Sequence, residues 1–218
     1  MLDMYNVDEV IQVISIGLIV AGFLLNANRF LKAIDLCNEC LFILDERAHL
    51  KDKTFSKSFY KRIYFTMWKA CSLIRDNTNA IKYGEKLLQI YRESGERSEE
   101  CKLSIELIER YFHGTKYAQA KELCERALLT SKEIGDSRLE ACCYGKLGAV
   151  YLSVGEYGKA REHLEKSLAV NRETGNRKGE AKSYESLGAI YRLVGEHEKG
   201  KDHIEKSQIG RASCRERV

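Results

Sequence analysis

Cys37 and Cys40 form a C-x-x-C pair, a spacing typical of structural zinc sites and of thioredoxin-like redox centres. A structural zinc site needs four ligands, and no second C-x-x-C or histidine pair follows at a suitable spacing. The redox motif needs a strand–helix–strand context, which the surrounding pattern lacks. We therefore expect no metal. We expect small buried thiols in a reducing compartment at Cys37, Cys40, Cys71, Cys101, Cys124, Cys142 and Cys143.

The five histidines do not combine with serine or cysteine into a known catalytic order. His197 and Glu198 open the run HEKGKDH, but the zinc motif H-E-x-x-H would need histidine where Lys201 stands. Gly155 and Gly158 are not followed by the Lys-Ser or Lys-Thr of a phosphate-binding loop. These departures predict that the chain is not an enzyme and binds no cofactor.

The composition excludes several classes of protein. The chain has 218 residues and no proline, whereas average usage would give about eleven. Its apolar share of 44% is too high for a disordered chain, and the missing proline argues against sandwiches rich in proline turns. The net charge is only +4, from 36 basic and 32 acidic residues, so composition gives no indication of nucleic-acid binding.

Internal repeats indicate the architecture. The segment from Gly135 to Ser167 aligns without gaps to the segment from Gly175 to Ser207, with 16 identities in 33 positions at a shift of 40 residues. The same shift taken backwards reaches a weaker third copy at Gly95, Leu107, Tyr111, Tyr117, Ala120 and Ala127. Each copy is predicted to be two helices, because apolar and small residues recur at helical spacing on both sides of an internal turn at Gly155. Asp136 and Asn176 are placed to cap the helices that follow them.

The repeated residues resemble the signature of the tetratricopeptide repeat. In one unit they are Tyr144, Leu147, Gly148, Tyr151, Gly155, Tyr157, Ala160 and Ser167; in the next, Tyr184, Leu187, Gly188, Tyr191, Gly195, His197, Gly200 and Ser207. The period of 40 and the missing proline depart from the usual 34-residue unit. This variant is similar to the repeats of the G-protein-signalling modulator family and of long tetratricopeptide arrays.

The resemblance implies an all-α solenoid of about five helical hairpins, a right-handed superhelix truncated at its C-terminal end. We expect divergent hairpins over residues 1–94, with an insertion loop near 45–57, and three units over 95–208, the last incomplete. The apolar run from Val10 to Leu25 is expected to be a buried first helix; at 16 residues it is short for a membrane span, so a membrane role is the weaker alternative.

The last ten residues, 209–218, break the repeat pattern and turn basic. Their codons can be read as a common short-read sequencing adapter, which predicts that the segment is not native; a genuine basic tail for an acidic partner is the alternative. In the adapter interpretation, the cut solenoid would expose an apolar face and self-associate through its C-terminal end.

The resemblance places a peptide-binding groove along the first helix of each unit. The matching positions are Lys102, Ile105, Glu109 and Phe112, then Cys142, Gly145, Ala149 and Leu152, then Lys182, Glu185, Ala189 and Arg192. Small apolar residues at the centre and charges at both ends suit a peptide or helix with an apolar middle and mixed-charge flanks. The competing interpretation is that these charges are only a solvated surface.

The leading prediction for function is therefore a non-enzymatic scaffold for protein–protein interaction, a cytoplasmic signalling adaptor. The alternative is the sensor or autoinhibitory arm of a larger signalling enzyme, a nucleotide triphosphatase or protease, whose catalytic domain lies outside this sequence. Arrays of this kind vary their groove while keeping their packing residues, so the sequence does not name the partner.

Overall fold

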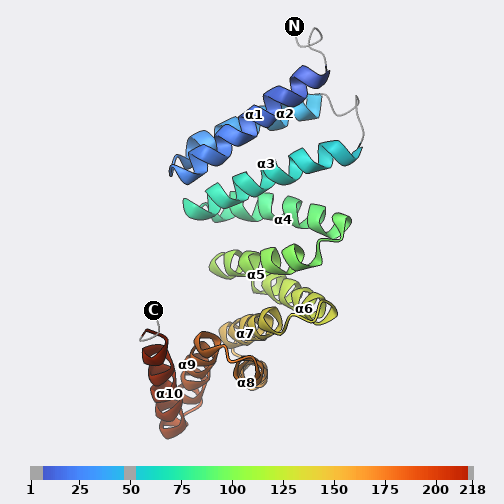
Figure 1. Cartoon of the computed structure of the whole chain (residues 1–218). Helices are drawn as coiled ribbons and strands as arrows, with labels where there is room; N and C mark the ends of the chain where they lie inside the picture. Colours follow the sequence, from blue (N-terminus) through green and yellow to red (C-terminus); the bar gives the residue numbers. More distant parts are fainter. Residues whose placement is uncertain (1–6, 47–52, 216–218) are drawn as a thin grey trace. The chain divides into compact units, whose positions relative to one another are not determined.

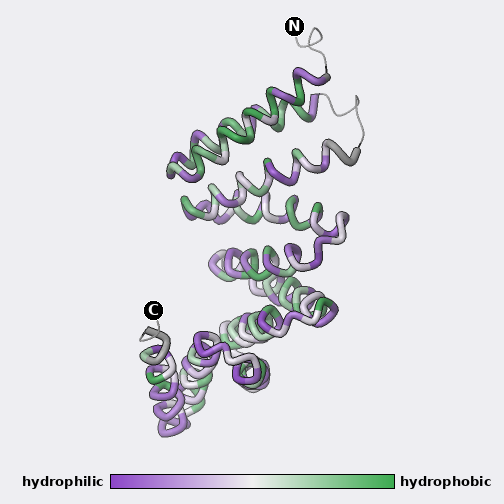
Figure 2. Tube along the Cα trace, in the orientation of Figure 1, coloured by the Kyte–Doolittle hydropathy of each residue, from purple (hydrophilic) through white to green (hydrophobic). Residues whose placement is uncertain are grey.

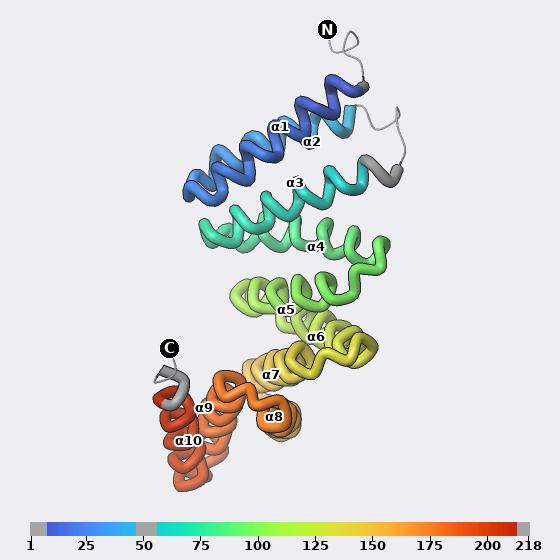
Figure 3. The backbone as a smooth tube through the Cα atoms, viewed as in Figure 1, coloured from blue at the N-terminus to red at the C-terminus, as the bar shows by residue number. Residues whose placement is uncertain are grey.

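The computed structural model describes residues 7–46 and 53–215, which form ten α-helices and no strand (Figure 1, Figure 3). Consecutive helices pair as five hairpins, which confirms the predicted all-α solenoid of tetratricopeptide type. The helices are α1 (Val7–Asn26), α2 (Phe30–Glu46), α3 (Lys53–Leu73), α4 (Asn77–Ser94), α5 (Arg97–His113), α6 (Tyr117–Glu133), α7 (Ser137–Ser153), α8 (Tyr157–Glu173), α9 (Arg177–Leu193) and α10 (His197–Arg215).

The chain divides into two compact units at Gly95. Unit 1, residues 1–95, contains α1–α4, and unit 2, residues 96–218, contains α5–α10. The predicted division lay at residue 94. The stretch expected as a loop, 45–57, is helical at both ends, because α2 continues to Glu46 and α3 begins at Lys53; residues 47–52 lie outside the described part.

Left-handed backbone turns recur every 20 residues and set the length of the helices. From the end of α3 onward, φ is positive at Arg75, Gly95, Thr115, Gly135, Gly155, Gly175 and Gly195. At Gly155, for example, φ is +79°, and the amide of Glu156 donates a hydrogen bond to the Tyr151 carbonyl at 2.9 Å. Glycine adopts this conformation at no steric cost, so at five of these seven turns it replaces the missing proline as the residue that ends the helix.

Side-chain caps begin two of the repeated helices, as the sequence predicts. The Asp136 carboxylate accepts hydrogen bonds from the amides of Arg138 and Leu139, both at 3.0 Å, at the start of α7. Asn176 accepts from the Gly179 amide at 3.1 Å at the start of α9. These bonds satisfy amides that have no partner inside the helix, so they fix where each first helix begins.

Within the α7/α8 hairpin, the helices approach closely at a glycine. A Cβ atom on Gly148 would lie 2.5 Å from Leu164 Cγ and 3.3 Å from the carbonyl oxygen of Ala160. The α9/α10 hairpin repeats the arrangement, with a Cβ on Gly188 only 3.0 Å from the Gly200 carbonyl. Close helix packing therefore compensates for the cost of glycine inside these helices.

The first helix is only half covered, which corrects the expectation that it is buried. Ile14, Leu18 and Ala21 are buried against α2 and α3, in one core cluster with Cys37, Cys40, Leu44, Phe59, Ile63 and Met67. On the other side of α1, Ile16 is 61% exposed and Phe23 is 71% exposed. Figure 2 shows the hydrophobic character of this helix. The stretch Asp8–Asn26 has a mean hydropathy of 1.9 and is long enough to cross a membrane, a property that helices of soluble proteins also show.

The final residues continue α10. This helix runs to Arg215, so most of the segment expected to lie outside the fold, 209–215, is helical. Gly210 lies against α9, where an added Cβ would be 3.2 Å from Ala181 Cβ, and Arg211 forms an ion pair with Glu185. Whether the segment is native stays a prediction.

Candidate functional site

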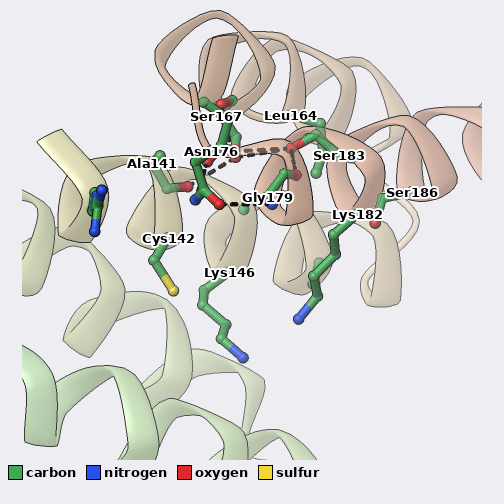
Figure 4. A pocket seen from close by; sticks show the side chains of 14 residues that line it. Ala141, Cys142, Lys146, Leu164, Ser167, Asn176, Gly179, Lys182, Ser183 and Ser186 are labelled. Atoms are coloured by element: carbon green, nitrogen blue, oxygen red, sulfur yellow. Dashed lines mark hydrogen bonds between the residues drawn. The ribbon is translucent and has the colours of Figure 1, made fainter. Parts of the chain in front are cut away.

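Unit 2 carries a cavity of about 170 Å³ between the first helices of its last two hairpins. Small residues of α7 form one wall, with Ala141, Gly145 and Ala149 leaving space that larger side chains would fill. Three cations, Arg138, Lys146 and Lys182, also line it. Figure 4 shows the side chains of Cys142, Lys146 and Lys182 extending to the same side of α7 and α9. The cavity is therefore both apolar and positively charged.

A second cavity, of about 250 Å³, lies between α5 and α7 and is lined by Ile108, Glu109, Phe112, His113, Lys146 and Ala149. Lys146 and Ala149 line both cavities. We call the two cavities together the groove. The groove thus follows the first helices of three consecutive hairpins in unit 2.

An ion pair joins α5 and α7 inside the groove. The Lys146 ammonium donates to the Glu109 carboxylate, and only 15% of the Lys146 side chain is exposed. Desolvation opposes ionisation of Glu109, but the hydrogen bond and charge of Lys146 outweigh it and lower the pKa of the carboxyl group. Glu109 therefore stays ionised, and its charge offsets that of Lys146, so Arg138 and Lys182 supply the net positive charge of the groove.

A buried polar network holds the back wall of the first cavity (Figure 4). Ser167 of α8 donates to the Ala141 carbonyl of α7 at 2.8 Å and lies 3.1 Å from the Ser183 hydroxyl of α9. Asn171 donates to the Ser167 carbonyl at 2.8 Å and accepts from Asn176 at 2.7 Å. Buried polar groups need such partners, so the network fixes the spacing of α7, α8 and α9 and with it the width of the cavity.

One repeat earlier, the equivalent contact between α5, α6 and α7 contains thiols in place of hydroxyl groups. Cys101, Ala127 and Cys143 form a small buried cluster, and the Cys101 thiol donates to the Ala127 carbonyl at 3.4 Å. Ala127 and Cys143 stand 40 residues before Ser167 and Ser183. The repeat therefore keeps the same packing site and exchanges thiol for hydroxyl chemistry.

Six of the seven thiols that the structure describes are buried. Burial raises the pKa of Cys37 to about 12, with the neighbouring Cys40 adding to the effect, and burial also raises the pKa of Cys40. Because metal binding and nucleophilic attack require the thiolate, this pair is suited to neither. Across residues 7–46 and 53–215, three or more His, Cys, Asp or Glu side chains nowhere gather into a possible metal site.

Cys142 differs from the expectation of buried thiols, because it is exposed and lines the first cavity. Protein atoms around the thiol still desolvate it in part and raise its pKa, despite the opposing effect of Lys146 and Lys182. The group is therefore an uncharged, small apolar contact at neutral pH.

The structure brings six of the twelve predicted groove residues to the cavities: Glu109, Phe112, Cys142, Gly145, Ala149 and Lys182. The other six are not among the residues that line them. Lys102 pairs with Glu99 at 2.8 Å, Ile105 packs on the Cys101 cluster, and Glu185 pairs with Arg211. Leu152 and Ala189 are half-buried, and Arg192 is exposed beside α10.

Sequence reasoning missed Lys146, the residue shared by both cavities. A signal was present, because Cys142, Lys146 and Ala149 are spaced by four and three residues and so lie on one face of α7. The positions assigned from the family resemblance include the adjacent Gly145 but not Lys146.

The family model described as tetratricopeptide repeat matches residues 100–173 and 147–208, together half of the chain. The chain belongs to the tetratricopeptide repeat family. The matched segments of this tetratricopeptide repeat protein contain the residues that line the groove and the two capping residues Asp136 and Asn176. No curated protein is significantly similar to the chain.

Solved structures share the fold of this tetratricopeptide repeat protein. The apo form of RapI matches with a TM-score of 0.78 at 16% identity, covering 93% of this chain and 72% of RapI. A STAND signal-transduction ATPase with a tetratricopeptide repeat sensor, PH0952 from Pyrococcus horikoshii, matches with 0.71 at 21% identity, covering 89% of this chain and 30% of that protein. A Rap protein complexed with competence and sporulation factor matches with 0.61 at 16% identity, covering 88% and 52%.

Proposed function

We propose that this protein is a non-enzymatic interaction scaffold that binds a peptide segment or helix of a partner protein in the groove of unit 2. The observation that carries the proposal is the pair of adjoining cavities along α5, α7 and α9, which share Lys146 and Ala149. The buried polar network holds α7, α8 and α9 in fixed register, and the Cys101 cluster packs α5 against α6 and α7. The groove is therefore formed before a partner arrives, and little ordering is needed on binding.

The lining defines the chemistry of the peptide. Ala141, Gly145 and Ala149 accept small or medium apolar side chains, whereas Lys182 and Arg138 attract a carboxylate. At the other end, Glu109 stands beside the aromatic ring of Phe112. The preferred segment therefore has an apolar centre, an acidic residue on the flank that meets α9 and a mixed-charge flank toward α5.

The similarity to a Rap protein complexed with competence and sporulation factor supports this proposal as an analogy of fold. We also propose that the protein acts as a cytoplasmic signalling adaptor, and that its 40-residue period belongs to the style of the G-protein-signalling modulator family and long arrays.

A random peptide library displayed on phage and selected on the full chain tests the proposal. We expect a shared motif with an acidic residue beside an apolar core. Ala149→Trp, which places a bulky ring where the two cavities meet, should abolish enrichment. Leu193→Trp, on the exposed tail of α9, is the matched control and should preserve it. Enrichment of the same motif on the Ala149 variant would overturn the proposal.

A second candidate is the sensor arm of a larger signalling enzyme. The observation that favours it is the fold shared with the STAND ATPase, of which this chain covers 30%. The open reading frame around this segment in genomic DNA separates the two candidates: an adjoining phosphate-binding loop supports the sensor arm, and further repeats alone support the adaptor.

A further inference from the structure

The exposed side of α1 in unit 1 carries an apolar stripe that the peptide groove of unit 2 does not use. Its residues are Val13, Ile16, Ile19, Val20 and Phe23, each at least 42% exposed. Val13, Ile16, Val20 and Phe23 follow one another at intervals of three, four and three residues. This is the spacing of a seam that packs against another helix.

We propose that this stripe is a self-association surface, on which α1 of a second copy of the chain packs antiparallel to form a two-fold symmetric dimer. In such a contact the same patch serves both copies, so it must be complementary to itself. The eleven residues from Val13 to Phe23 span ten helical rises, so the stripe is about 15 Å long, which matches one helix-on-helix contact.

Charge complementarity selects the antiparallel arrangement. Acidic Asp8 and Glu9 stand at the start of α1, and basic Arg29 and Lys32 stand at its other end, in the turn and the first part of α2. An antiparallel second copy brings the acidic end of each chain to the basic end of the other. A parallel copy would place like charges together at both ends.

The same register also matches the apolar residues. When the acidic and basic ends meet, the two-fold axis passes beside Ile19 and Val20, and Ile16 of one copy faces Phe23 of the other. The branched Ile16 and the ring of Phe23, 61% and 71% exposed, then cover one another. Both the charges and the apolar contacts therefore support one alignment.

A lipid surface fits the stripe less well. The opposite face of α1 is held in the core through Ile14, Leu18 and Ala21, so the helix cannot leave unit 1 to span a bilayer without opening that core. Residues 7–46 contain six acidic and two basic side chains. Helices that lie on membranes are instead rich in lysine and arginine, which anionic headgroups attract.

Sedimentation equilibrium of the full chain tests the dimer. A contact of this size predicts a weak dimer that forms between about 10 and 100 µM. Ile16→Lys should raise the dissociation constant by about tenfold or more. Leu193→Lys, which changes an equally exposed leucine on α9, should leave it unchanged. Circular dichroism establishes that both variants keep their helix content.

Charge reversal gives the sharper result. Arg29→Glu with Lys32→Glu makes both ends of the stripe acidic, and Asp8→Lys with Glu9→Lys makes both ends basic, so each variant alone should be monomeric. An equimolar mixture should dimerise, because each end then meets its opposite. A monomeric mixture, a monomeric wild-type chain at 100 µM or flotation with phosphatidylcholine–phosphatidylserine vesicles in place of a dimer would overturn the proposal.

Discussion

The imidazole of His163 stacks on the phenol ring of Tyr151, with ring centroids 5.3 Å apart and 10° between the planes. One unit later His203 also packs on a tyrosine: its ring centroid lies 4.9 Å from that of Tyr191, with the two planes tilted by 54°. These histidines therefore serve the packing of each hairpin. The Nδ1 atom of His163 is buried and has no hydrogen-bond partner among the described residues.

This burial makes the stability of the hairpin depend on pH. Desolvation lowers the pKa of His163, and the Lys166 charge adds to the effect. The unfolded chain takes up a proton near the ordinary pKa of about 6.5, whereas the folded imidazole resists it. The contribution of His163 to the free energy of unfolding should therefore be fully present above about pH 6.5 and be lost progressively as the pH drops below that value.

Urea unfolding of the wild-type chain and of His163→Phe between pH 5.5 and 7.5 measures this dependence. Phenylalanine keeps a ring against Tyr151 but cannot be protonated. The free energy of unfolding of the variant should therefore rise relative to that of the wild type as the pH falls. Parallel pH profiles of the two proteins would exclude His163 as the cause.

The turn at Thr115 is strained. It has φ +57°, at the position in the 20-residue series where Gly155 stands two turns later. A β-branched residue in left-handed backbone costs about 1–2 kcal/mol. We expect Thr115→Gly to raise the free energy of unfolding by about 1 kcal/mol and Gly155→Thr to lower it by a similar amount. Thermal and urea unfolding measure both, and a destabilised Thr115→Gly chain would contradict this account of the turns.

Removal of residues 209–218 should have a small effect on stability. The segment contacts α9 through the approach of Gly210 to Ala181 and through the exposed Arg211–Glu185 ion pair. Exposed ion pairs contribute about 0–1 kcal/mol. We expect a chain ending at Gln208 to keep its helical spectrum and to unfold within about 1 kcal/mol of the full chain. Cooperative unfolding lost on truncation would show that α10 requires the segment.

Periodicity made the repeated part of the fold predictable. Leu147 and Leu187 occupy the same position in two copies of the repeat. Apolar residues that recur in both copies at helical spacing identify the face of each helix that packs in the core. Asp136 and Asn176 are adjacent to a helix-ending glycine, so the caps also followed from local chemistry. Local rules repeated at a fixed period therefore determine the hairpins.

Features that depend on neighbouring helices were less predictable. The composition of α1 predicts an apolar helix, but exposure of Ile16 and Phe23 depends on which helices cover it. Likewise, Lys146 lines both cavities because of the way α7 packs between α5 and α9, which the sequence of α7 alone does not specify. Cys142 is exposed for the same reason, although its sequence context resembles that of the buried Cys143.

The central claim is that the groove of unit 2 binds a peptide that carries an acidic residue. Fluorescence anisotropy with the acidic peptide selected on the wild-type chain measures it most directly. Lys182→Glu reverses a cation of the cavity, and Arg192→Glu reverses an exposed cation of the same helix outside it. We predict that Lys182→Glu weakens binding by about tenfold, or 1.4 kcal/mol, and that Arg192→Glu leaves it nearly unchanged. Equal affinities for the wild-type chain and the Lys182 variant would contradict the account.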